Sequence, residues 1–129
     1  WVRRPRAMSR LSPPRSSTGV IPHNGPNGSV LLEDLPAECQ GAYEGAFMRT
    51  ASTGCLEANE VSDELDRMVA QYNSGDPFYD QDRYDDLAAY YDRLYVRCQA
   101  ASYSEDEAIA IWVACLKKHA LTPNQVWVG

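Results

Sequence analysis

The sequence predicts an all-α protein of about four helices, arranged as a disulfide-stapled antiparallel helical hairpin that follows an extended N-terminal arm. Three observations support this fold class. From residue 34 onward, apolar side chains recur at helical spacing, and no stretch alternates as a strand would. Four cysteines fall into two widely separated pairs. The first 32 residues hold five of the eight prolines, too many for a packed helix or strand.

Charge divides the chain into a basic arm, residues 1–32, and a helical, cysteine-paired domain, residues 33–129. The arm has five arginines and no acid, whereas the domain carries a net charge of −11. An acidic domain repels nucleic-acid phosphate, so we expect no nucleic-acid partner. No apolar run approaches the roughly 18 to 20 residues that cross a bilayer, so we expect no transmembrane segment.

The first two predicted helices are short. Asp34 is a good N-cap for the first, with Pro36 in its first turn, and Gly54 is a plausible stop. Ser62 is expected to cap the second helix. The run from 73 to 77, Asn-Ser-Gly-Asp-Pro, should end it, because glycine and proline interrupt helices.

The third and fourth helices have clearer signals. Asp80 or Asp82 should open the third. Its apolar stripe keeps the spacing of one helix face: Leu87, Tyr91, Leu94, Tyr95 and Cys98. Ser104 with Glu107 forms a capping box, so the fourth helix should begin there and run to about Leu121.

No pattern predicts a metal, a cofactor or a catalytic centre. A structural zinc site normally pairs ligands two to four residues apart, and the two cysteine pairs are spaced by 16 and 17 residues. We interpret His23 and His119 as isolated. A calcium loop beginning at Asp80 would need a glycine where Asp85 stands. The chain is therefore expected not to be an enzyme.

Four cysteines in a small acidic helical protein suggest two disulfides and an oxidising compartment. Cys39 and Cys55 should bracket one helix and lie about 20 Å apart, too far to bond. Cys98 and Cys115 flank a turn near Ser102 unequally, so their direct pairing is also poor. Two connectivities between the pairs remain. An antiparallel arrangement favours the nested one, Cys39 with Cys115 and Cys55 with Cys98.

These features resemble the coiled-coil-helix (twin CX9C) proteins, although the spacings here are wider. The matching elements are Cys39-x15-Cys55, Cys98-x16-Cys115, Tyr95-x-x-Cys98 and Trp112-x-x-Cys115. The resemblance implies nested disulfides between two helices and an aromatic import signal that an oxidising receptor reads. It also implies residence in the mitochondrial intermembrane space, where many members are accessory subunits of respiratory complexes.

The expected function is therefore that of a non-catalytic accessory subunit of a mitochondrial membrane complex of the respiratory chain. The protein would be peripheral to the inner membrane on its intermembrane-space side, bound to other subunits. Two alternatives stay open. One is a secreted, disulfide-stabilised helical binding protein, which the glycosylation sequon at Asn27 would suit. The other is a matrix or cytosolic assembly subunit with reduced cysteines.

The arm supplies the predicted partner-binding residues. We expect its arginines to meet acidic protein groups or anionic lipid phosphate, and its tryptophan to enter an apolar pocket. These residues are Trp1, Arg3, Arg4, Arg6 and Arg10. The Arg- and Ser-rich, acid-free composition is also typical of a transit peptide, and a first residue other than methionine is what presequence removal would leave.

Overall fold

The computed structural model describes residues 29–49 and 51–128, and the predicted all-α fold is confirmed in that part of the chain. Four α-helices occupy most of it: α1 (Ala37–Tyr43), α2 (Ala51–Ser74), α3 (Gln81–Ala101) and α4 (Glu105–Lys118). A π-helical turn at Glu44–Met48 extends α1. Short 3-10 turns lie at Leu32–Asp34 and Pro123–Gln125.

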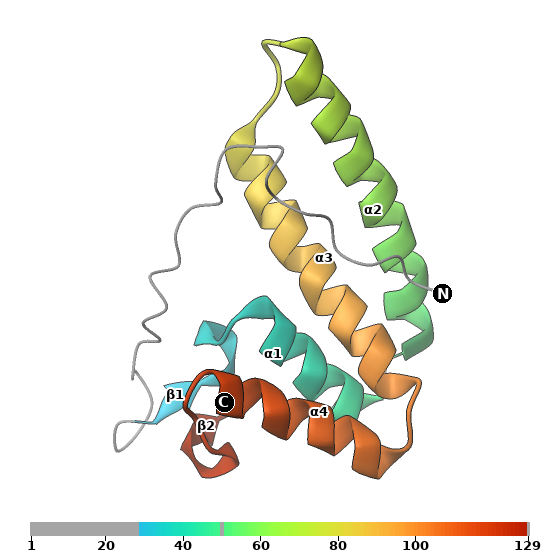
Figure 1. Ribbon diagram of the computed structural model, residues 1–129. Helices are drawn as coiled ribbons and strands as arrows, with labels where there is room; N and C mark the ends of the chain where they lie inside the picture. The colour runs from blue at the N-terminus through green and yellow to red at the C-terminus, as the bar shows by residue number, and fades with distance from the viewer. Residues whose placement is uncertain (1–28, 50, 129) are drawn as a thin grey trace.

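The helices form a long hairpin and a short pair (Figure 1). Helices α2 and α3 run antiparallel and enclose one core, made by Ala58, Leu65, Met68, Tyr84, Tyr91, Leu94 and Cys98. Helices α1 and α4 lie side by side and, with the end of α3, enclose a second core. Its members are Val30, Leu35, Cys39, Ala42, Ala46, Ala100, Ala108, Trp112, Leu116 and Leu121. The close packing of α1 against α3 joins the two layers.

The first helix begins and ends differently from the prediction. Asp34 lies in the 3-10 turn, and α1 starts after Pro36, whose fixed φ suits a helix start. The stop is Arg49, which adopts the left-handed conformation with φ 54° and donates its backbone N–H to the Glu44 carbonyl. The Arg49 guanidinium also donates to the Tyr103 carbonyl at 3.0 Å, which helps to hold this uncommon conformation.

Helix α2 is twice as long as expected because neither punctuating residue acts as predicted. Gly54, expected to end the first helix, lies inside α2, where its missing side chain makes room for the Arg97 guanidinium. Ser62, expected to cap the second helix, is 2% exposed in the middle of α2. The predicted break between residues 54 and 62 was therefore wrong.

Two caps are confirmed. The Asp80 carboxylate accepts hydrogen bonds from the backbone N–H groups of Asp82 and Arg83 at the start of α3. The Ser104 hydroxyl accepts one from the Glu107 N–H at the start of α4. Helix α4 ends at Lys118, three residues earlier than predicted.

A two-residue parallel strand pair joins the two ends of the described chain. Strand β1 (Val30–Leu31) pairs with β2 (Val126–Trp127). Val30 is fully buried in the second core. The folded body therefore includes at least residues 29–32, which we had assigned to the arm, because these apolar side chains have a core to enter.

Candidate functional site

The nested disulfide connectivity is confirmed. Cys39 bonds Cys115, with Cα atoms 5.6 Å apart, and Cys55 bonds Cys98, with Cα atoms 5.1 Å apart. The reason for rejecting a Cys39–Cys55 bond was wrong, however. These residues do not bracket one helix, because Arg49 separates α1, which carries Cys39, from α2, which carries Cys55.

Each disulfide lies within one of the two layers. The Cys39–Cys115 bond joins α1 to α4, and the Cys55–Cys98 bond joins α2 to α3. The contact between the layers has no covalent bond. It depends on the helix packing of α1 and α3, and on Glu44, whose carboxylate lies 3.4 Å from the Arg97 guanidinium and 3.9 Å from that of Arg93.

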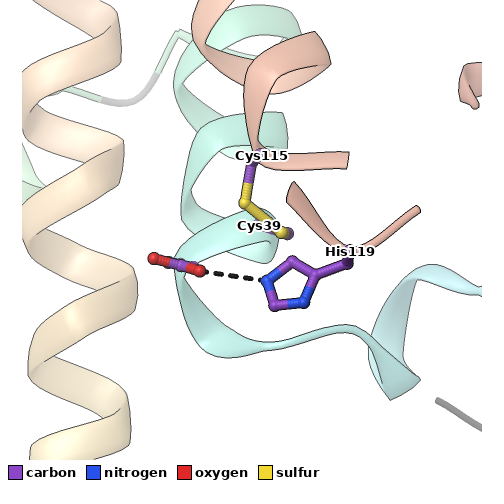
Figure 2. Close-up of side chains that lie close together, drawn as sticks. Cys39, Cys115 and His119 are labelled. Carbon is purple, nitrogen blue, oxygen red and sulfur yellow. Dashed lines mark hydrogen bonds and ion pairs between the residues drawn. A yellow bond between two sulfur atoms is a disulfide. The ribbon is translucent and has the colours of Figure 1, made fainter. Parts of the chain in front are cut away.

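A polar cluster surrounds the Cys39–Cys115 bond. Glu38 precedes Cys39 in the first turn of α1, and its carboxylate lies 3.1 Å from the His119 ring nitrogen and 3.4 Å from the Lys118 ammonium. Figure 2 shows the His119 ring beside the disulfide, with its carboxylate contact dashed. One donor atom each from Glu38, Cys39, Cys115 and His119 lies within 4.8 Å of every other.

Electrostatics differ between the two carboxylates at this junction. Partial burial alone would raise the pKa of Glu38, but the hydrogen bond with His119 and the charge of Lys118 outweigh it and lower that pKa. Asp92 on α3 has no such compensation. Burial, followed by the negative charge of Glu38, raises the pKa of Asp92 to about 6.

We expect Asp92→Asn to raise the free energy of unfolding by about 2 kcal/mol at neutral pH, because the variant buries no charge. The folded chain holds an Asp92 proton that the unfolded chain loses near its ordinary pKa of 3.8. The Asp92 contribution to stability therefore falls as the pH rises from about 4 to about 6, and stays low above that.

Urea unfolding of both proteins, followed by circular dichroism, measures the effect at several pH values. The stability difference should be small near pH 3.5 and reach its full size above about pH 6.5. A difference that does not change with pH would contradict the assigned cause.

Sequence reasoning missed His119 as a site residue. Its relation to Cys115 carries a signal, because residues four apart on one helix share a face, and Cys115-x-x-x-His119 has that spacing. The nearness of Glu38 carries none, since it depends on how α1 packs against α4. The interpretation of His119 as isolated was therefore wrong.

Several large apolar side chains stay exposed in the part of the chain that the structure describes. The largest exposures among them belong to Phe47, Met48, Leu56, Phe78, Trp127 and Val128. The predicted partner-binding residues Trp1, Arg3, Arg4, Arg6 and Arg10 lie outside the described residues. Within those ranges, each helix is too short or too polar to traverse a lipid bilayer.

The chain matches no protein-family model, no curated protein and no solved structure.

Proposed function

We propose that the protein is a non-catalytic accessory subunit of a mitochondrial membrane complex, bound on the intermembrane-space side of the inner membrane. The observation that carries this proposal is the pair of nested disulfides, which tie α1 to α4 and α2 to α3. Disulfides persist in oxidising compartments, and this nested plan is the one that the resemblance to coiled-coil-helix proteins implies.

The surface adds support for a subunit role. Phe78 is 86% exposed at the turn between α2 and α3, and Met48 is 59% exposed beside the end of α1. Exposed apolar side chains of this size are stable in water but gain free energy when a partner covers them. The basic arm complements this surface, because arginine anchors to acidic groups with planar, bidentate geometry.

The proposal is tested by locating the native protein and its thiols. In isolated mitochondria the chain should resist protease until the outer membrane is ruptured, and it should leave the membrane in alkaline carbonate. After mild detergent extraction it should migrate with a large complex on a native gel. Alkylation under denaturing conditions should find no free thiol. Four free thiols, or a glycan on Asn27, would instead support the matrix or cytosolic alternative, or the secreted one.

A truncated variant tests the arm separately. Deleting residues 2–28 keeps Val30 and its strand partner, so the helical body should retain its helical circular dichroism and both disulfides. Its co-migration with the large complex should weaken, because the arginines and Trp1 are gone. Co-migration at the wild-type level would remove the arm from the proposed interface.

A further inference from the structure

The sulfur atoms of Cys39 and Cys115 lie among ligands that a disulfide does not need. Besides the two sulfurs, the cluster offers an imidazole nitrogen from His119 and a carboxylate oxygen from Glu38. Two thiolates, one imidazole and one carboxylate make a set of four that suits tetrahedral Zn²⁺. The other disulfide differs, since Cys55 and Cys98 belong to no such group of three or more donors among residues 29–49 and 51–128.

The distances fit a tetrahedral ion after a small movement. Zinc holds sulfur at about 2.3 Å and nitrogen or oxygen at about 2.0–2.2 Å, which sets neighbouring ligands about 3.3–3.8 Å apart. His119 and Glu38 already lie 3.1 Å apart, and all four donors lie within 4.8 Å. The two sulfurs must separate by somewhat less than 2 Å once their bond is broken.

The helices position these ligands in pairs. Cys115 and His119 lie one turn apart at the end of α4, so one helix face supplies a local chelate. Glu38 and Cys39 follow each other in the first turn of α1. Cys39 is fully buried, whereas Cys115 is partly exposed and the His119 side chain is 23% exposed. A reductant or an ion therefore has access from the Cys115 side.

We propose that Cys39, Cys115, His119 and Glu38 form a zinc site in the reduced chain. The junction of α1 and α4 is then closed by a disulfide under oxidising conditions and by Zn²⁺ under reducing conditions. A dithiol reductant gives two electrons to the Cys39–Cys115 bond, becomes a disulfide itself and passes its two protons to the sulfurs. Zn²⁺ displaces those protons to solvent as it binds. This inference does not depend on the compartment proposed above.

The test uses the 129-residue chain, reduced with a water-soluble phosphine that becomes a phosphine oxide and does not compete for zinc as a dithiol would. Calorimetric titration should show one Zn²⁺ per reduced chain and at least tenfold weaker binding to the oxidised chain. Co²⁺ in place of Zn²⁺ should give thiolate charge-transfer bands and the intense visible bands of a tetrahedral ion. Zn²⁺ should also raise the melting temperature of the reduced chain.

Variants connect the binding to the proposed ligands. His119→Ala and Glu38→Gln should each weaken zinc binding by about tenfold or more. His23→Ala, which removes the other histidine of the chain, is the matched control and should bind as the wild type does. Cys39→Ser/Cys115→Ser keeps the second cysteine pair and should lose the site. Melting curves of the oxidised single variants check that each still folds, because both disulfides are then intact.

Three results would overturn the proposal. The first is unchanged affinity in both His119→Ala and Glu38→Gln, which would mean that the two thiols alone account for binding. The second is a Cys39→Ser/Cys115→Ser protein that binds zinc as tightly as the reduced wild type. The third is a reduced chain that stays unfolded with zinc bound, because the junction of α1 and α4 would then not be closed.

Discussion

Removing either disulfide is expected to lower the free energy of unfolding by about 3 to 4 kcal/mol, and removing both should leave the chain unfolded at about 37 °C. The residues joined are 76 apart for Cys39–Cys115 and 43 apart for Cys55–Cys98. Loops of that size lose much conformational freedom when closed, so each bond restricts the unfolded chain strongly. Small domains are stable by only about 5 to 15 kcal/mol, so losing both bonds removes much of the total.

The variants are Cys39→Ala/Cys115→Ala, Cys55→Ala/Cys98→Ala and the four-site combination. Urea unfolding followed by the helical circular dichroism signal gives the three stabilities. Leu56→Ala is the control, because Leu56 is 69% exposed and its truncation should change stability by less than about 0.5 kcal/mol. A loss below about 1 kcal/mol in both double variants would show that the bonds hardly constrain the unfolded chain.

Gly41→Ala is expected to destabilise the fold by about 3 kcal/mol, the upper end of the usual cost of overpacking. A Cβ atom at this position would lie 2.2 Å from the backbone carbonyl oxygen of Arg93, which cannot move without displacing α3. Gly45 lies one turn further on the same face, and its Cβ would meet the Arg97 carbonyl at 2.7 Å. These two glycines let α1 approach α3 where no disulfide joins the layers.

Gly54→Ala is the matched control for this prediction. Its nearest neighbour is the Nε atom of the Arg97 side chain at 2.7 Å, and a side chain adjusts more easily than a backbone. Alanine also favours a helix interior by up to about 1 kcal/mol over glycine, so the control should be close to neutral. The same denaturation series measures both variants. Equal losses at the two positions would refute the importance of the α1–α3 approach.

Local chemistry made part of this fold predictable. Asp80 and Ser104 act as caps because their side chains bond to backbone N–H groups two or three residues away, and sequence shows that relation directly. The stripe on α3 was equally readable, with Tyr91, Leu94 and Cys98 all buried. The nested connectivity followed from the reach of a disulfide and the order of the helices.

The remaining features depend on tertiary contacts. A glycine predicts a helix end, but Gly54 continues the helix because the Arg97 side chain occupies the space above it. Arg49 ends its helix in a conformation that arginine seldom adopts, held in part by a bond to Tyr103, 54 residues away. The cluster at His119 likewise needs Glu38, 81 residues distant, and no local pattern announces such a pair.

The strand pair between β1 and β2 determines how a mechanical load would pass through the protein. The strands are parallel, so tension applied before Val30 and after Trp127 shears their hydrogen bonds together instead of opening them one at a time. Beyond the strands, the load reaches the covalent bond between Cys39 and Cys115. Residues 40–114 lie inside that closed loop and carry no tension. A pull from a neighbouring subunit would thus lengthen only the segments outside the loop, while most of the helical body kept its shape.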